Sequence, residues 1–178
     1  MNTFNLLDCT LRDGGYYNNW DFSKKAIQEY LYAVESSNIK FIELGFRFND
    51  KIKNKGLTAY TDNKLINKLK ISDKTNIGIM INASDYIVSG KIDLEKLRKV
   101  IPKNISKKVK FIRVACHHAE VMMLNNFFKY IESFKLKIFI NIMQISEINN
   151  KQISKISSYL SNKKCVSVLY LADSLGAL

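Results

Sequence analysis

Short apolar runs rich in β-branched residues alternate with longer amphipathic stretches along almost the whole chain. The runs begin 27 to 37 residues apart, which is the length of one strand followed by one helix. Because several runs are apolar on both faces, we expect strands that are covered on both sides, as in a parallel sheet. The six expected strands are residues 4–9, 40–44, 77–81, 110–115, 137–142 and 166–172.

Between these runs the apolar residues recur at helical spacing, over residues 23–37, 93–101, 120–134 and 147–160. Ser23 is expected to cap the first of these helices, and Pro102 to stop the second. Strict alternation of strands and helices allows an open doubly wound sheet or a (β/α)₈ barrel, and periodicity does not separate the two. No linker-like composition divides residues 1–178, so we expect a single domain.

The composition narrows the classes of function. The formal net charge is +12, but the lysines are dispersed and form no arginine-rich cluster with interleaved aromatic residues. We therefore expect no nucleic-acid partner, and the positive charge suits a small anionic substrate such as a carboxylate equally well. Three distant cysteines without a CxxC pair predict neither disulfides nor a zinc site. The absence of a signal peptide and of long apolar segments predicts a cytoplasmic protein without membrane contact.

The most informative segment follows the first expected strand and reads L-D-C-T-L-R-D-G-G over residues 7–15. Chemistry in α/β folds is concentrated at the carboxyl ends of strands. Here Asp13 can offer a hard oxygen ligand to Mg²⁺ or Mn²⁺, and Arg12 can hold a carboxylate or an enolate oxygen. Gly14 and Gly15 are expected to let the backbone turn sharply beside a ligand. A plain turn with a structural Asp–Arg ion pair is the alternative.

The segment resembles the D-x-T-L-R-D-G signature of the DRE-TIM metallolyases, the family of 3-hydroxy-3-methylglutaryl-CoA lyase and other pyruvate carboxyltransferase-type domains. Three later motifs resemble the family's second, fourth and sixth strands in the same order: F-I-E-L-G-F-R at 41–47, F-I-R-V-A-C-H at 111–117 and A-D-S-L-G-A at 172–177. The D-G-G-Y-Y-N-N-W continuation is most similar to the branch of 4-hydroxy-2-oxovalerate aldolase-like members. The resemblance implies a metal-dependent TIM barrel of which about six βα units are present, without strands 7 and 8.

The resemblance also implies roles for individual residues. Asp13 would bind the divalent metal, Mn²⁺ or Mg²⁺, and Arg12 would stabilise the enolate oxygen of pyruvate or another 2-oxo acid. Ser174 matches a position that helps to hold the substrate carboxylate. The substrate partners would be a small 2-oxo acid and an aldehyde, and a homodimer is a family expectation.

Three further side chains are candidates for the same site. Glu43 lies in an otherwise apolar strand, where an unpaired carboxylate is costly, so we expect it to support the metal site or to pair with Arg12 or Arg47. Arg47 is a candidate clamp for the substrate carboxylate, with a surface ion pair as the alternative. His117 is a candidate proton relay or substrate contact, with a structural role at the strand end as the alternative.

Two departures from the family limit these expectations. Where 4-hydroxy-2-oxovalerate aldolases carry a histidine base, this chain has Tyr16, whose ordinary pKa near 10 makes it a poor base at neutral pH. The family's H-x-H metal ligands on the seventh strand have no counterpart, because the two histidines present are adjacent. We therefore expect this chain to be a C-terminally truncated piece with weak or absent activity of its own.

The hypotheses left open by the sequence are of different classes. The first is a metal-dependent aldolase or lyase that cleaves or forms a carbon–carbon bond next to a 2-oxo acid. A Claisen-type acyltransferase similar to isopropylmalate or homocitrate synthase is the second. A truncated remnant or interaction domain without catalytic activity is the third. The least favoured is a basic nucleic-acid-binding domain, which would bind DNA or RNA in a salt-dependent way.

Overall fold

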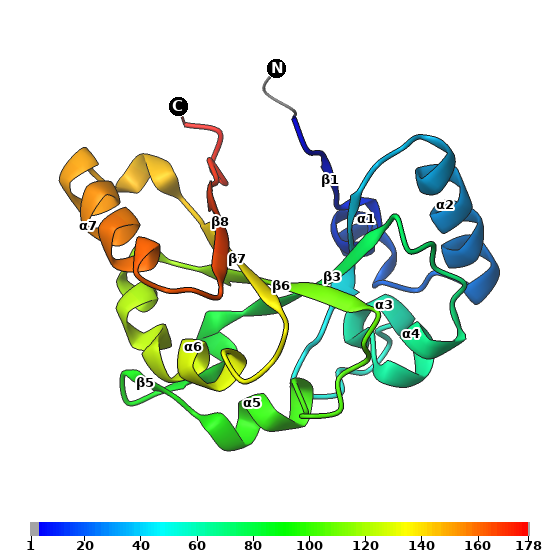
Figure 1. Ribbon diagram of the computed structural model, residues 1–178, viewed down its shortest axis with the longest axis horizontal. Coiled ribbons are helices and arrows are strands. Elements are labelled where there is room, and N and C mark those ends of the chain that lie inside the picture. Colours follow the sequence, from blue (N-terminus) through cyan, green and yellow to red (C-terminus); the bar gives the residue numbers. More distant parts are fainter. Residues whose placement is uncertain (1–3, 178) are drawn as a thin grey trace. The chain divides into compact units, whose positions relative to one another are not determined.

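The structure is a computed structural model that describes residues 4–177. Its main strands follow one another in the order β1-β2-β3-β6-β7-β8 (Figure 1). This is an α/β fold in which the six strands of the main sheet are parallel wherever their register is defined, and their order is that of the first six strands of a (β/α)₈ barrel. The expected fold class is confirmed. The strand bounds are Leu7–Asp8, Phe41–Phe46, Asn76–Asn82, Val109–Cys116, Lys137–Ile142 and Val166–Leu171, respectively.

The chain divides into two compact units, which are described separately. The first comprises Met1–Met80 with Asn104–Phe111, and the second comprises Ile81–Lys103 with Ile112–Leu178. The single domain expected over residues 1–178 stays a prediction.

In the first unit, β1 pairs with β2 in parallel, so that Leu7 lies opposite Phe41 and Asp8 opposite Ile42. β2 also pairs in parallel with β3, and the register shifts between Glu43 and Phe46. β1 is shorter than the expected strand 4–9. Phe4 and Leu6, which were expected to belong to it, lie before its first residue and are largely exposed. The helices of this unit are α1 (Thr10–Asn18), α2 (Lys24–Ser36), α3 (Leu57–Tyr60) and α4 (Asn63–Lys68).

Helix α2 forms where the apolar period predicted it. Ser23 is its N-cap, and the Ser23 hydroxyl accepts a hydrogen bond from the Ala26 N–H at 3.1 Å. Ile27, Leu31 and Val34 recur at helical spacing and are buried. Both the cap and the buried stripe are confirmed.

Helix α1 corrects the expected turn at Gly14 and Gly15. Both glycines lie inside a regular helix, which ends at Asn19 in the left-handed conformation. Gly15 is required because the Trp20 ring packs against it, and a Cβ there would lie 2.0 Å from Trp20 Cδ1. A Cβ on Gly14 would meet only Phe22 Cζ, at an ordinary 3.5 Å. Tertiary packing, and not a turn, therefore explains the second glycine.

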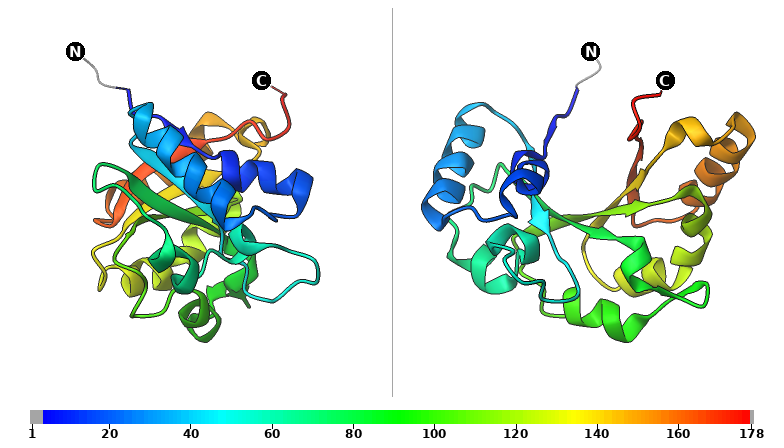
Figure 2. Two further views of the ribbon diagram at one scale, coloured as in Figure 1. Left: turned by 90° about the vertical axis from the view of Figure 1, so that its right-hand side faces the viewer. Right: turned by 180° about the vertical axis from the view of Figure 1, so that it is seen from behind.

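The second unit contains β7 and β8, which pair in parallel from Ile138 opposite Val166 to Ile142 opposite Leu171. Figure 2 shows α7 beside β8 from two further directions. An antiparallel hairpin of β4 and β5, which the sequence did not predict, precedes α5. The remaining bounds are η1 (Ala83–Tyr86), β4 (Ile87–Val88), β5 (Lys91–Ile92), α5 (Leu94–Val100), η2 (His118–Leu124), α6 (Asn125–Ile131), η3 (Ile145–Glu147) and α7 (Asn150–Ser161).

The expected helix over residues 120–134 is two elements, the 3₁₀ helix η2 and the α-helix α6. Its inward residues are nevertheless buried as the apolar period predicted, namely Val121, Leu124, Phe127, Phe128 and Ile131. Among the described residues, no helix has both the length and the apolar character that crossing a membrane requires.

The neighbouring glycines of α1 offer a matched test of its packing. Gly15→Ala should lower the free energy of unfolding by about 1–3 kcal/mol, because the new methyl group meets the Trp20 ring. Gly14→Ala should raise it by up to about 1 kcal/mol, because alanine is the better helix former and has room. Urea unfolding followed by circular dichroism measures both. Equal effects of the two substitutions would contradict the packing of Trp20 on Gly15.

Candidate active site

The centre of the candidate site is an ion pair between Arg12 on α1 and Glu43 on β2. Arg12 Nε donates to Glu43 Oε1 at 2.5 Å. The Glu43 side chain is fully buried, at 0% exposure, in the strand F-I-E-L-G-F. Burying a carboxylate in apolar surroundings is costly unless a charged hydrogen-bond donor compensates it, and Arg12 is that donor. The pairing of Glu43 with Arg12, one of the expected alternatives, is present.

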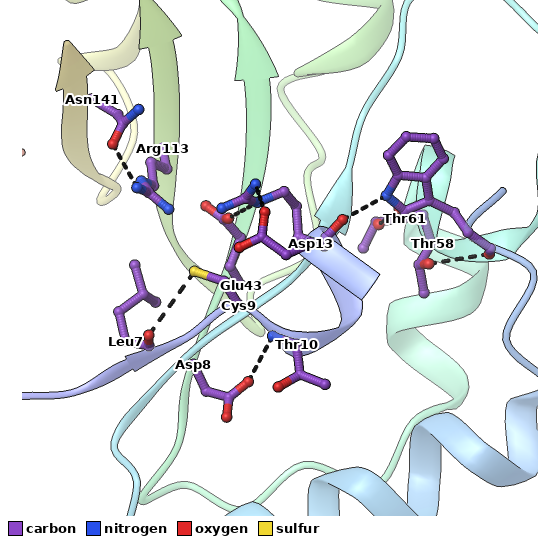
Figure 3. A network of polar contacts seen from close by, with 12 residues as sticks. Leu7, Asp8, Cys9, Thr10, Asp13, Glu43, Thr58, Thr61, Arg113 and Asn141 are labelled. Carbon is purple, nitrogen blue, oxygen red and sulfur yellow. Dashed lines mark hydrogen bonds and ion pairs between the residues drawn. The ribbon is translucent and has the colours of Figure 1, made fainter. Parts of the chain in front are cut away.

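Asp13 contacts the same guanidinium from the solvent side. Arg12 Nη1 donates to Asp13 Oδ1, and the Asp13 side chain is 59% exposed. Figure 3 shows Asp13 and Glu43 close together, with the bonds as dashed lines. Burial alone would lower the pKa of Arg12, but the charges of Glu43 and Asp13 outweigh burial and raise it. The guanidinium is therefore a cation at neutral pH.

Two of the three Arg12 nitrogens are thus engaged by carboxylates. Among residues 4–177, the third nitrogen, Nη2, donates no hydrogen bond. The Arg12 side chain as a whole is 12% exposed. A guanidinium N–H that no protein group engages can donate to an incoming carboxylate or enolate oxygen.

Trp20 supports the Arg12 turn of α1, and sequence reasoning missed this residue. Its indole Nε1–H donates to the Arg12 carbonyl at 2.9 Å, and its ring is almost fully buried. Tyr16 and Phe46 approach the ring edge-on, with centroids at 4.8 and 5.6 Å. The available signal was the chain's single tryptophan, placed just after the signature motif.

A pocket of about 480 Å³ lies in the first unit, beyond the carboxyl end of β2. Lys51, Lys55 and Tyr60 line it together with Asp21 and Asp62, so its charges are balanced. Its volume falls in the range of small-molecule sites. The Lys55 ammonium nitrogen lies 4.0 Å from the centre of the neighbouring Trp20 ring.

Arg47 lies at the end of the same strand as Glu43, but its side chain points into the protein. It is buried, and its Nε and Nη2 donate to the Thr61 carbonyl and to Asn63 Oδ1, both at 2.9 Å. These bonds connect the end of β2 to the start of α4. A role of Arg47 as a substrate clamp stays a prediction, and the observed contacts are those of a structural tie.

Tyr16, the candidate that replaces the family's base, lies one helical turn beyond Arg12 on α1. Its side chain is 64% exposed, and its ring packs on the edge of Trp20. The hydroxyl group is therefore open to solvent or to a ligand. Its catalytic role stays a prediction.

The remaining candidates, His117 and Ser174, belong to the second unit. The Ser174 hydroxyl accepts from the Gln144 N–H at 3.1 Å, and the His117 N–H donates to Glu120 Oε2 at 2.8 Å. The Ser174 bond joins the loop after β8 to the loop after β7, and the His117 bond fixes the start of η2. Their roles in substrate binding stay predictions.

The second unit also contains a polar row that sequence reasoning did not single out. Arg113 on β6 and Asn141 on β7 are both buried, and Arg113 Nη2 donates to Asn141 Oδ1 at 2.5 Å (Figure 3). The Arg113 guanidinium lies 4.7 Å from the centre of the Tyr170 ring on β8. An arginine inside an apolar strand was the signal that could have found this row.

The described residues do not by themselves form a metal centre. Among residues 4–177, no group of three or more His, Cys, Asp or Glu side chains lies close enough to hold a metal ion. Asp13 offers an exposed carboxylate, of which one oxygen is engaged by Arg12. Asp13 is the exposed carboxylate that the Arg12 cluster offers, and a tightly bound divalent cation requires further ligands.

Comparison with known proteins places the fold among aldolase and lyase domains. No family model matches the chain, and no curated protein matches it by sequence. Among solved structures, the N-terminal domain of a proposed aldolase from Bacteroides vulgatus is similar at 25% identity and a TM-score of 0.73, covering 97% of this chain and 65% of that one.

Two hydroxymethylglutaryl-CoA lyases share the fold at lower identity. The Bacillus subtilis enzyme is 12% identical and the Pseudomonas aeruginosa enzyme 10%, each with a TM-score of 0.68 and coverage of 98% of this chain and 59% of that one. The chain thus spans less than two thirds of each of the three proteins. The two lyases therefore show what fold this chain has, and no more.

Asp8, the first residue of the signature motif, anchors the end of β1. Its Oδ1 accepts from the Tyr30 hydroxyl on α2 at 2.5 Å and from the Thr10 N–H at 2.8 Å. Burial by itself raises the pKa of Asp8, but the hydrogen bonds from Tyr30 and Thr10 outweigh it, and the net pKa is lowered. Asp8 thus holds β1, the start of α1 and helix α2 together.

Tyr30→Phe should therefore destabilise the protein in a pH-dependent way. Because the folded-state pKa of Asp8 is lowered, its stabilisation is present above the ordinary value of 3.8 and is lost as the pH falls through the folded value. We expect a loss of about 1 kcal/mol at pH 7, allowing for partial exposure, and a smaller loss at pH 3. Urea unfolding at both pH values measures it. The control is Tyr32→Phe on the same helix, which should change little, and a pH-independent loss in Tyr30→Phe would contradict the role of Asp8.

Proposed function

We propose that this chain is part of a DRE-TIM metallolyase that cleaves or forms a carbon–carbon bond next to a 2-oxo acid, in the manner of 4-hydroxy-2-oxovalerate aldolases. The observation that carries the proposal is the Arg12 guanidinium at the end of β1, fixed by Glu43 and Asp13, with Nη2 left to bind an oxyanion. Similarity to a proposed aldolase domain over 97% of the chain supports it.

Arg12 has a defined task in this reaction. When a 4-hydroxy-2-oxo acid is cleaved, the bond between C3 and C4 breaks and the 4-hydroxyl group loses its proton to become the aldehyde carbonyl. The electron pair moves toward C2, so that negative charge develops on the C2 oxygen of the pyruvate enolate. A preorganised cation that meets this charge lowers the barrier, because it needs no reorientation during the reaction. Protonation of C3 then gives pyruvate.

Glu43 and Asp13 prepare Arg12 for this task. Glu43 is buried and holds Nε, so it restrains the guanidinium from the protein side. Asp13 is exposed and holds Nη1, so two of the three nitrogens are restrained and Nη2 is left to a ligand. The two carboxylates also keep the arginine charged despite its burial.

A divalent metal is part of the proposal for the whole protein, with Mn²⁺ or Mg²⁺ as the expected ion. Such an ion supplies Lewis-acid polarisation of the substrate oxygens when it is bound. Asp13 is the ligand that this chain would contribute, through the oxygen that Arg12 does not engage. The described residues provide no complete site, so the other ligands would come from elsewhere in the whole protein.

Arg12→Ala should lower kcat for cleavage of 4-hydroxy-2-oxovalerate by about 10² to 10³-fold, because it removes an oxyanion donor. Arg12→Lys should recover little of the lost kcat. An ammonium group lacks the planar set of N–H donors with which a guanidinium can contact Glu43, Asp13 and the substrate at once. Pyruvate release coupled to lactate dehydrogenase measures the rate, with Mn²⁺ present, in a protein that contains this chain and whose wild type cleaves the substrate. Arg98→Ala, at an exposed ion pair on α5, is the matched control and should leave turnover unchanged. Unchanged turnover in Arg12→Ala would refute the assigned role.

Asp13→Asn should weaken Mn²⁺ binding by at least about tenfold wherever the protein binds the metal, because a neutral amide is a poorer ligand than a carboxylate. Calorimetric titration with MnCl₂ measures the affinity. Asp73→Asn, at an exposed aspartate remote from Arg12 in sequence, serves as the control. Equal Mn²⁺ affinity in the wild type and in Asp13→Asn would remove Asp13 from the metal site.

A further inference from the structure

Trp20 adopts a backbone conformation that a bulky side chain rarely takes. Its φ is +59°, directly after Asn19 at +57°. Asparagine tolerates the left-handed region, but tryptophan does so at a cost in free energy. Such strain persists only where the surroundings determine the conformation, and it is concentrated at functional sites.

The surroundings of Trp20 hold its backbone in this conformation. Its carbonyl accepts from the Thr58 hydroxyl at 3.1 Å and from the Thr58 N–H at 3.3 Å. The preceding Asn19 carbonyl accepts from the Gly56 N–H at 2.8 Å. The backbone of residues 19–20 is therefore bound to the start of α3, which follows the lysine-containing loop after β2.

The ring of Trp20 is held as closely as its backbone. One face fits the space that the missing side chain of Gly15 leaves. The Lys55 ammonium group lies 4.0 Å from the ring centre and 5.2 Å from the centre of the Phe48 ring, close enough for cation–π attraction to both. With the ring fixed in this way, the indole N–H has one direction in which to donate.

That direction is the Arg12 carbonyl, at 2.9 Å. The indole N–H is a donor only and makes a single strong hydrogen bond. Arg12 lies in the first turn of α1, eight residues before Trp20, so the bond ties that turn to the far end of the same helix. The strained residue and the cation of the candidate site are thus in direct contact.

We propose that Trp20 is a positioning residue, which fixes the Arg12 turn of α1 through its indole N–H so that the guanidinium meets Glu43 in one orientation. Lys55 and Thr58 act on Arg12 through Trp20, because they hold the ring and the carbonyl of Trp20 in place. That this positioning matters for catalysis rests on the proposed function. That Trp20 positions Arg12 rests only on the contacts of Trp20 described above.

The chain contains one tryptophan, so biosynthetic replacement of tryptophan changes residue 20 alone. In a tryptophan auxotroph, β-(3-benzothienyl)alanine keeps the bicyclic shape and replaces the N–H by sulfur. The readout is the Arg12 Nε–Hε signal in ¹⁵N NMR, assigned by its loss in Arg12→Lys. We expect this signal to shift and its exchange with solvent to become about fivefold faster, which corresponds to the loss of one typical hydrogen bond. An unchanged signal would overturn the inference.

Two controls separate positioning from general damage. Phe134→Leu removes a ring that packs on Tyr130 and keeps the indole N–H of Trp20 with its neighbours, so it should leave the Arg12 signal in place. In the unsubstituted protein, the Trp20 Nε1–H itself should exchange at least about tenfold more slowly than a free indole, because it is hydrogen-bonded. Exchange at the free rate would overturn the inference without any variant.

Activity distinguishes this inference from the proposed function. In a protein that cleaves 4-hydroxy-2-oxovalerate, the benzothienyl substitution should lower kcat severalfold while KM changes little, since the charge that binds substrate remains. A protein with the NMR change but without cleavage would refute the proposed function and support the positioning. Lowered kcat with an unchanged Arg12 signal would refute the positioning and leave the proposed function standing.

Discussion

The arrangement of the first unit depends on how a single buried carboxylate is compensated. Glu43 has no exposed surface and lies in a strand that is otherwise apolar, so it is tolerated because Arg12 donates to it. That requirement brings the first turn of α1 against β2 and fixes the guanidinium at the end of β1. Asp13 then meets the same cation from the solvent side, and one nitrogen remains for a ligand.

A second constraint keeps that first turn in place, and it is steric as much as electrostatic. The Trp20 ring fills the space beside Gly15, and its N–H reaches back to the Arg12 carbonyl. The strained backbone at Trp20 is supported by Thr58, and its ring by Lys55. The candidate site is therefore supported by α1, by the loop after β2 and by α3, whose residues carry no obvious chemistry in the sequence.

Much of the fold was predictable, because period and composition report burial directly. The strand over residues 137–142 begins and ends where expected, and Ser23 caps α2 as expected. The failures occurred where tertiary contacts override local preference. Two glycines in succession suggested a turn, but both lie inside α1, and the packing of the Trp20 ring explains the second of them. Contacts between distant positions also gave Arg47 partners that the sequence did not indicate, namely Thr61 and Asn63, and its role as a ligand clamp stays a prediction.

The sequence by itself determined the alternation of strands and helices, and it singled out the motif with Arg12 and Asp13 and the strand with Glu43. The alternation follows from the apolar period, and the interest of Glu43 from the cost of burying charge, both of which are local properties of the chain. The choice of a barrel over an open sheet came from the resemblance of the motifs. The tertiary structure alone decided which partner each charge meets, and which residues support it from a distance. Those contacts join positions 31 residues apart, as for Arg12 and Glu43, and no local preference of either residue encodes the direction of its side chain.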